Sequence, residues 1–89
     1  MKAQVPVQVQ VRYFASLREA LGAHEQLQVP AGATLGDVRD QLVASTPRHA
    51  EALARTRTLR GAINQVMCNE AAVVPEGAEV AFFPPVTGG

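Results

Sequence analysis

VPVQVQVRYF, residues 5–14, alternates apolar and polar side chains with a period of two. One face of this stretch carries the apolar residues Val5, Val7, Val9, Val11 and Tyr13, and the other carries Gln8, Gln10, Arg12 and Phe14. A period of two with β-branched residues is typical of a strand that buries one face. The sequence therefore predicts an opening strand that lies against a hydrophobic core.

Helix signals follow this strand at two places. Residues 16–19, SLRE, have the spacing of a capping box, and Gly22 suits a helix C-cap, which predicts a short helix from about Leu17 to Leu21. The main helix is expected to begin after Thr34, a good N-cap. Its first turn holds Asp37, and its apolar stripe is formed by Leu35, Val38 and Leu42. Pro47 is expected to end this helix, and residues 48–54 to add another helical turn or two.

Further strands are predicted at residues 24–29, 61–67, 71–74 and 79–83, with a turn at Pro75-Glu76-Gly77 that Val74 would begin. In the last strand Val80 and Phe82 are assigned to the core, because Glu79 on the alternate face should stay solvated. Glu79, Ala81 and Phe83 then share the opposite face. One principal helix covers only one face of a small sheet, so we expect an α+β domain whose open face carries Phe83 as a candidate partner surface.

Composition excludes several classes of protein. Eight basic residues balance eight acidic ones, which argues against a nucleic-acid partner, and no apolar run approaches the ~20 residues that span a bilayer. We therefore expect a cytoplasmic domain with no membrane partner. Cys68 is the single cysteine and is expected to be inert, and His24 and His49 are expected to lie at the surface, so no metal site is predicted.

Charges are nevertheless distributed unevenly along the chain. Arg48, Arg55, Arg57 and Arg60 gather in residues 48–60, whereas every charged residue from position 70 onward is acidic (Glu70, Glu76 and Glu79). Such runs are usually solvated surface. The alternative is that the acidic end of the chain docks on a basic partner surface.

FFPPVTGG, residues 82–89, is the most unusual stretch. Pro84 and Pro85 fix φ and remove two backbone donors, which favours an extended path away from the sheet. The six residues from Pro84 to Gly89 reach at most roughly 20 Å. Gly88 and Gly89 lack a Cβ and suit a narrow channel in another protein. The ionised carboxyl of Gly89 becomes a good electrophile only with a leaving group, which adenylation by a partner enzyme would provide.

The chain resembles the small subunits of molybdopterin synthase, a family of sulfur carriers with a ubiquitin-like β-grasp fold. The matching segments are residues 11–19 (VRYFASLRE), 34–35 (TL), 62–65 (AINQ) and, above all, 79–89 (EVAFFPPVTGG). Ala78 stands where the family usually has an aspartate after the turn glycine. The resemblance implies a mixed sheet covered on one face by one main helix, with a β-grasp domain over residues 1–83 and a flexible Gly-Gly tail over residues 84–89.

The resemblance also implies a chemistry, in which the chain is not an enzyme on its own. Gly89 would be adenylated by an ATP-using, ubiquitin-activating-type adenylyltransferase, and sulfur from a donor protein would then replace the activated group to give a thiocarboxylate. The tail would enter the large subunit of the synthase and give its sulfur to cyclic pyranopterin monophosphate, which builds the dithiolene that holds molybdenum or tungsten. Gly88 would pass through the channel. The partner would be contacted by Phe83, Pro84, Pro85, Val86 and Thr87. No cofactor is expected on the chain itself.

Three other functions remain open. A thiamine-pathway sulfur carrier shares the fold and the Gly-Gly end but usually lacks the Phe-Phe-Pro-Pro approach. A ubiquitin-like modifier would form isopeptide bonds with lysines of other proteins. A plain β-grasp binding module would carry the tail incidentally.

Overall fold

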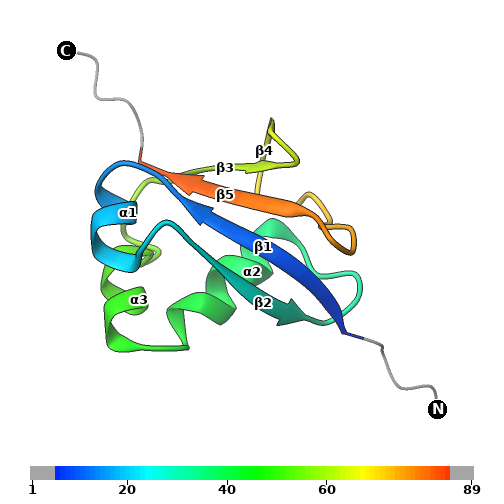
Figure 1. Cartoon of the computed structure of the whole chain (residues 1–89), viewed down its shortest axis with the longest axis horizontal. Coiled ribbons are helices and arrows are strands. Elements are labelled where there is room, and N and C mark those ends of the chain that lie inside the picture. The colour runs from blue at the N-terminus through cyan, green and yellow to red at the C-terminus, as the bar shows by residue number, and fades with distance from the viewer. Residues whose placement is uncertain (1–5, 85–89) are drawn as a thin grey trace.

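The computed structural model describes residues 6–84 of the chain (Figure 1). Its elements, in chain order, are β1 (Val7–Tyr13), α1 (Ser16–Leu21), β2 (His24–Val29), α2 (Leu35–Val43), α3 (Pro47–Ala52), β3 (Arg60–Ile63), β4 (Val66–Cys68) and β5 (Glu79–Phe83). The predicted strands β2 and β5 are confirmed residue for residue, and β1 follows the predicted alternation. Val5 and residues 85–89 lie outside the described part, so the division into a domain and a tail stays a prediction.

The five strands form one mixed sheet in the order β2-β1-β5-β3-β4. β1 and β5 are parallel, with Val11 beside Val80 and Tyr13 beside Phe82, and the other three strand pairs are antiparallel. The first and last strands of the chain therefore lie side by side at the centre of the sheet (Figure 1). This arrangement, with helices on one face, is a ubiquitin-like β-grasp, and the predicted α+β fold class is confirmed.

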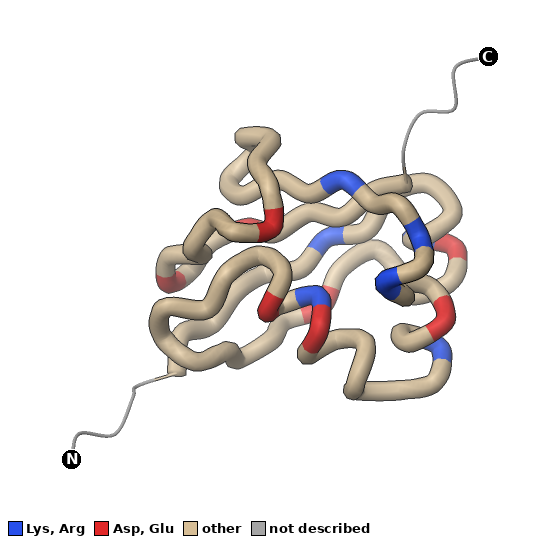
Figure 2. Tube along the Cα trace, turned by 180° about the vertical axis from the view of Figure 1, so that it is seen from behind, with Lys and Arg blue, Asp and Glu red and all other residues tan. Residues whose placement is uncertain are grey.

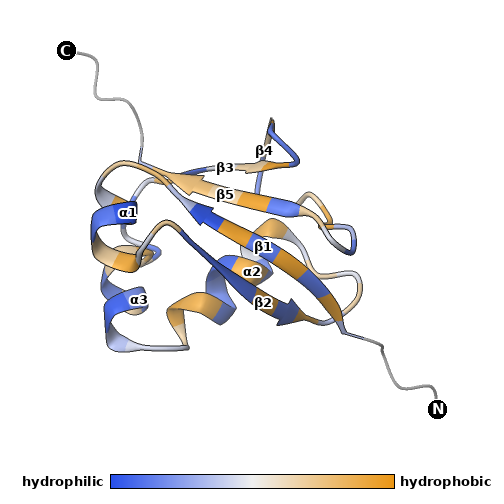
Figure 3. Cartoon of the chain, in the orientation of Figure 1, coloured by the Kyte–Doolittle hydropathy of each residue, from blue (hydrophilic) through white to orange (hydrophobic). Residues whose placement is uncertain are grey.

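One face of the sheet is covered by helices, and the hydrophobic core lies between them. Figure 3 shows the alternation that produces this face as hydrophobic and hydrophilic bands along β1. Val80 and Phe82 are only 0% and 1% exposed, as their assignment to the core predicts. They pack in one buried cluster with Leu17 of α1, Leu35 of α2 and Ala52 of α3. All three helices thus contribute to the same covered face.

The start of α2 was well predicted, and its end was not. The Thr34 hydroxyl accepts from the Asp37 N–H at 3.1 Å, and the Asp37 carboxylate accepts from the Thr34 N–H at 3.0 Å. These two bonds form a complete capping box, which satisfies two of the N–H groups that a helix start leaves unpaired. The helix ends at Val43, however, and Pro47 opens α3 instead of stopping α2. Proline suits a first helical turn because no intrahelical partner is needed there.

The capping box predicted at residues 16–19 is wrong. α1 begins at Ser16 itself, its N-cap is Ala15 with a φ of 56°, and no side chain caps its first turn. The predicted C-cap is confirmed, since Gly22 has a φ of 95° and its N–H donates to the Arg18 carbonyl. A left-handed backbone of this kind favours glycine at the C-terminal end of a helix.

Residues 61–67 were predicted as one strand, and the structure divides them into β3 and β4. Asn64 and Gln65 form the turn of a hairpin, with φ values of 51° and 69°. Positive φ at both central residues belongs to the tight turns that match the twist of a hairpin. The Asn64 carboxamide also accepts from the Glu79 N–H at 2.9 Å, which ties this turn to the start of β5.

The strand predicted at residues 71–74 is also wrong, because only Val73 pairs there, in an isolated bridge with Thr34. The turn before β5 is confirmed but starts one residue later than expected. The Ala78 N–H donates to the Pro75 carbonyl at 3.2 Å, and Gly77 has a φ of 77°. Pro75 is therefore the first residue of this turn, and Ala78, 2% exposed, packs into the core where the resembling family usually has aspartate.

Candidate functional site

Some of the predicted site residues lie within the described part of the chain, which ends at Pro84, and the others lie beyond it. Phe83 is the last residue of β5, and Pro84 follows it, both half-buried. Pro85, Val86, Thr87, Gly88 and Gly89 lie outside the described residues, so their predicted roles are not tested by the structure. The structure therefore describes only the surface around Phe83 and Pro84, from which residues 85–89 continue.

Phe83 lies on the face of the sheet opposite the helices, as predicted. Register pairing places Ala81 between Arg12 of β1 and Ala62 of β3, and Met67 of β4 is the partner of Ala62. These side chains share one face because residues directly opposite in neighbouring strands point to the same side of a sheet. Among residues 6–84, the helices all pack on the other side of the sheet. The sheet therefore has one open face.

Phe83 contacts Phe14, which follows β1. The two ring centroids are 5.8 Å apart, and Phe14 is 41% exposed. The Phe14 N–H donates to the Phe82 carbonyl at 3.2 Å, which holds the residue after β1 against the end of β5. The guanidinium of Arg12 lies 6.0 Å above the Phe14 ring and 3.3 Å from the Glu79 carboxylate. These charged groups border the aromatic pair on one side.

An apolar surface surrounds this aromatic pair, and we call it the open-face patch: Phe14, Ala62, Met67, Ala81 and Phe83. Together with Arg12, Gln65 and Glu79 it lines a groove of about 460 Å³. Met67 is 50% exposed. The sequence pattern predicted only Phe83 of this patch as a partner contact, although the period of two places Phe14 on the same face as Arg12. Met67 was missed because the hairpin turn at residues 64–65 was not recognised.

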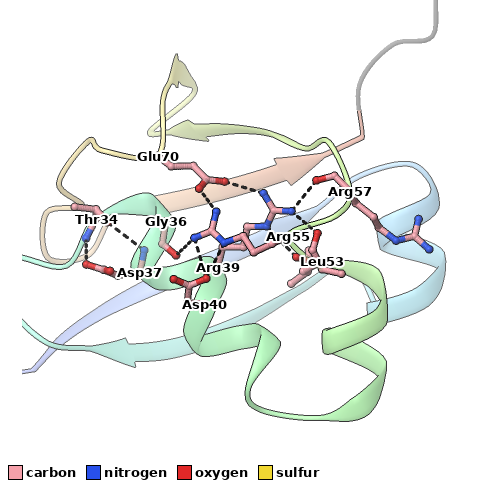
Figure 4. A network of polar contacts seen from close by, with 10 residues as sticks. Thr34, Gly36, Asp37, Arg39, Asp40, Leu53, Arg55, Arg57 and Glu70 are labelled. Carbon is pink, nitrogen blue, oxygen red and sulfur yellow. Dashed lines mark hydrogen bonds and ion pairs between the residues drawn. The ribbon is translucent and has the colours of Figure 1, made fainter.

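A second cluster, which the sequence did not predict, joins α2 to the segment between α3 and β3 (Figure 4). Arg39 is 4% exposed. Its guanidinium donates to the carbonyls of Leu53, Ala54 and Arg57 at 2.9, 2.6 and 2.9 Å, and to the Glu70 carboxylate at 2.7 Å. A buried charge is tolerated when every nitrogen of the group has a hydrogen-bond partner, as each of these three does. Arg39 thus fixes the chain that leads into β3.

Arg55 extends the cluster at the surface. Its guanidinium bonds to the carboxylates of Asp40 and Glu70 and to the Gly36 carbonyl. Burial of Glu70 opposes its ionisation, but the hydrogen bonds and charges of Arg55 and Arg39 outweigh burial and hold the pKa of Glu70 below its usual value. The cluster is therefore a structural ion-pair network on the covered side of the molecule.

These pairs change the interpretation of the charge runs. Arg55 is bound into the network, whereas Arg48, Arg57 and Arg60 are exposed as a solvated surface would be. Two of the three late acidic residues, Glu70 and Glu79, are already ion-paired within the chain. Figure 2 shows positive and negative positions interspersed around the fold. The alternative of an acidic end that docks on a basic partner also involves the terminal carboxylate, outside residues 6–84, and stays a prediction.

His49 was predicted to lie at the surface, and that prediction is wrong. Its side chain is only 14% exposed, and Nε2 lies 2.7 Å from the carboxylate of Glu25, which also accepts from the Tyr13 hydroxyl at 2.7 Å. Burial, and then the bond and charge of Glu25, raise the pKa of Tyr13 far above its usual value, so its hydroxyl remains a donor. This group links β1, β2 and α3. His24, by contrast, is exposed as predicted.

Cys68 is a half-buried free thiol that packs against the core from β4. It lines a groove of about 620 Å³ together with Arg60, Glu70 and Phe82, among others. Within residues 6–84, no group of three or more His, Cys, Asp or Glu side chains is placed to hold a metal ion. No helix in this part of the chain is long and apolar enough to cross a membrane.

Comparison with known proteins adds family relationships to this geometry. The sulfur carrier subunit of molybdopterin synthase from Mycobacterium tuberculosis is 35% identical over 85 residues, 93% of this chain and 99% of that protein. The subunit of the same name from Escherichia coli is 36% identical over 81 residues, 91% and 99% of the two chains. Small archaeal modifier protein 1 from Haloferax volcanii is 36% identical over 84 residues, 88% of this chain and 97% of that protein.

The crystal structure of that archaeal modifier covers 90% of this chain and 99% of its own, with a TM-score of 0.74 at 27% identity. Its fold is thus shared over nearly the whole length. The profile of the ThiS family matches residues 11–89, which include β1 from Val11 onward and every later element. This chain therefore belongs to the ThiS family.

Proposed function

We propose that this chain is the sulfur carrier subunit of a molybdopterin synthase, with sulfur carried on the carboxyl group of Gly89. The position of the segment that leads to Gly89 supports this most directly. β5 ends at Phe83 in the middle of the sheet, beside the open-face patch, and Pro84 begins the last six residues there. Two full-length relatives bear that name, and the family profile extends to residue 89.

The proposed chemistry needs little from the chain itself. A carboxylate of Gly89 attacks the α-phosphate of ATP in the adenylyltransferase, pyrophosphate leaves, and the acyl-adenylate forms. Hydrosulfide delivered by a donor protein then attacks the carbonyl carbon, the C–O bond to AMP breaks, AMP leaves, and loss of the S–H proton to water gives the thiocarboxylate. In the large subunit the thiocarboxylate gives its sulfur to cyclic pyranopterin monophosphate. The chain supplies position, and its partners supply catalysis and ATP. We place these steps in the cytoplasm.

The open-face patch is the surface on which we propose that the large subunit docks. An inserted tail makes only a narrow contact, and aromatic anchors commonly dominate the energy of an interface. Phe83 and Phe14 offer such an anchor next to Pro84, with exposed Met67 at the far side of the groove. Pro84, Pro85, Val86 and Thr87 would continue the contact into the large subunit, where Gly88 would pass its narrowest part.

A second candidate function is protein modification. The likeness to the archaeal modifier favours it, since that protein matches this chain over nearly its full length. A modifier would use the same adenylated Gly89 but transfer it to a lysine of another protein. A thiamine-pathway carrier would use the same thiocarboxylate with a different acceptor.

Reconstitution separates these candidates. The chain is incubated with ATP, an adenylyltransferase of the ubiquitin-activating type and a sulfur donor, and then with the large subunit and cyclic pyranopterin monophosphate. We expect a thiocarboxylate on Gly89 and formation of molybdopterin. Thiocarboxylate without molybdopterin points to another sulfur pathway, and lysine-linked products without molybdopterin point to a modifier. Adenylation of Gly89 that is followed by neither a thiocarboxylate nor a lysine-linked product would contradict both sulfur-carrier functions, in the molybdopterin pathway and in the thiamine pathway.

One added residue after Gly89 is the matched control. It moves the reacting carboxyl by more than about 3 Å, and a misplacement of ~1 Å can already cost about 100-fold in rate. We expect the extended chain to fold normally and to lose sulfur loading. Gly88→Ala should leave the melting temperature unchanged and slow adenylation or sulfur transfer, because it introduces a Cβ at the channel. Normal loading of the extended chain would overturn the proposal.

A further inference from the structure

The charged side chains of the open face are not distributed evenly between its two ends. Residues directly opposite in neighbouring strands point to the same side of a sheet, so the register defines successive rows across this face. In these rows Phe83 is opposite Arg60, Ala81 is opposite Arg12, and Glu79 is opposite Gln10. The two arginines therefore lie toward the end at which Pro84 follows β5, and the carboxylate lies toward the other end.

Arg60, the first residue of β3, shares its row with Phe83 and is exposed. Its neighbour Gly61 faces the core, because a Cβ added there would lie 2.5 Å from Cδ2 of Leu35. Successive residues of a strand point to opposite sides, which places the Arg60 side chain on the open face. Within residues 6–84 the structure contains no ion pair of Arg60. Its positive charge is therefore available to a partner.

Arg12, in contrast, is balanced within the chain, since its guanidinium lies 3.3 Å from the Glu79 carboxylate. Glu79 is the one acidic side chain that the strands of residues 6–84 place on the open face. Four steps along β5 separate it from Phe83, about 13 Å, which exceeds the Debye length of ~8 Å at physiological ionic strength. Glu79 thus balances Arg12 but not Arg60, and the end of the open face beside Pro84 is positively charged.

We infer that Arg60 sets the direction in which the large subunit docks, by pairing with carboxylates around the point where that subunit receives the segment after Pro84. This inference rests on the proposed docking at the open-face patch. Apolar contact is non-directional, so the patch alone does not distinguish two orientations that differ by half a turn. Only one of them directs Pro84 toward the partner's channel.

Charge separates the two orientations. In the productive one the carboxylates of the partner meet Arg60, and in the reversed one they meet Glu79. Complementary charges steer the encounter of two proteins, and like charges brought together exclude the wrong arrangement. The partner surface that fits this face is therefore an apolar contact for Phe83 and Phe14 with acidic side chains on the side of Pro84.

The test measures association and dissociation rates of the intact chain with the large subunit from the same organism, at low and at high salt. Arg60→Glu should associate about tenfold more slowly at ~50 mM NaCl and less than about threefold more slowly at ~500 mM, because salt screens exposed charges. Phe83→Ala should act mainly on the dissociation rate, as the loss of an apolar anchor does. The melting temperature of Arg60→Glu should stay within a few degrees of the unaltered chain, since Arg60 is exposed.

Arg48→Glu is the matched control. It makes the same change in net charge at an exposed residue of α3, on the covered side of the sheet, and should slow association less than about threefold at low salt. Arg60→Lys keeps the charge and should retain the association rate. Equal slowing by Arg60→Glu and Arg48→Glu would overturn the inference, because net charge alone would then explain it. Faster association of Arg60→Glu would also overturn it, since the partner surface would then be basic.

Sedimentation of the chain alone tests a second copy as the occupant of this face. A dimer that Arg60→Glu disrupts would overturn the inference, because Arg60 would then pair with its own chain. If the unaltered chain does not bind the large subunit at all, the proposed function fails. If it binds and Arg60→Glu leaves the association rate unchanged, the inference alone fails.

Discussion

Phe82 and Phe83 are adjacent in β5 but belong to different regions of the molecule. Phe82 is 1% exposed within the core that the helices cover, and Phe83 lies half-buried on the open face against Phe14. The covered face holds the fold together, and its polar groups are paired internally, as Arg39 shows. The open face carries none of the helices among residues 6–84 and leaves Phe14 and Met67 exposed. With the proposed docking on the open face, stability and partner binding would be separated by a one-residue step along a strand.

The largest expected effect is on the covered face. Phe82→Ala removes a fully buried aromatic ring and should lower the free energy of unfolding by about 3–5 kcal/mol. Urea denaturation measures this loss. A loss below about 1 kcal/mol would show that the core does not depend on Phe82. It would contradict the assignment of stability to the covered face.

Phe83→Ala is the matched change on the open face. It should weaken binding of the large subunit by tens-fold, about 2 kcal/mol, as the loss of an interface anchor does. The free energy of unfolding should fall by no more than about 1.5 kcal/mol, the upper range for an aromatic pair. Titration calorimetry and urea denaturation give the two values. Unchanged binding would remove Phe83 from the proposed docking surface.

Gly61 and Ala62 sharpen the same comparison on β3. A Cβ added at Gly61 would lie 2.5 Å from Cδ2 of Leu35, which is itself 1% exposed, so Gly61→Ala forces the core to shift. We expect a loss of about 1–3 kcal/mol. Ala62→Ser adds one hydroxyl on the open face at a position that is 4% exposed, and it should cost about 1 kcal/mol, less than Gly61→Ala. Thermal melts of both variants check this order, and equal losses would contradict it.

The smallest effect concerns the ion-pair network and depends on pH. The folded pKa of Glu70 lies below its usual value of 4.5, so its contribution to stability is present above that value and is lost as pH falls through the folded pKa. Glu70→Gln should therefore be less stable than the unaltered chain at pH 7, and the difference should shrink by pH 3. Exposed Glu76→Gln, measured in the same way, should differ by less than about 0.5 kcal/mol at both values. A constant difference for Glu70→Gln would contradict the network.

Local patterns in the sequence were sufficient for much of this fold. The alternation in β1 and β5 predicted their faces, and Thr34 with Asp37 predicted the start of α2. The hairpin at Asn64-Gln65 was missed because its positive φ values carry no glycine to mark them. Arg39 and His49 were missed because their burial depends on partners at least 14 residues away, Leu53 and Glu25 among them. Of the open-face patch, the sequence predicted Phe83. Met67 was not predicted, because its place in the sheet depends on the unrecognised hairpin turn at residues 64–65.

The central claim is that Gly89 carries sulfur, and the intact mass of the chain purified from cells tests it most directly. The expected result is a fraction of chains in which one oxygen atom is replaced by sulfur, with the change located on Gly89 by fragmentation. The sulfur-containing fraction should disappear from the chain extended by one residue. The test uses cells that make molybdopterin and have this protein as their single sulfur carrier subunit of molybdopterin synthase. If the unaltered chain from those cells carries no thiocarboxylate, the account is contradicted.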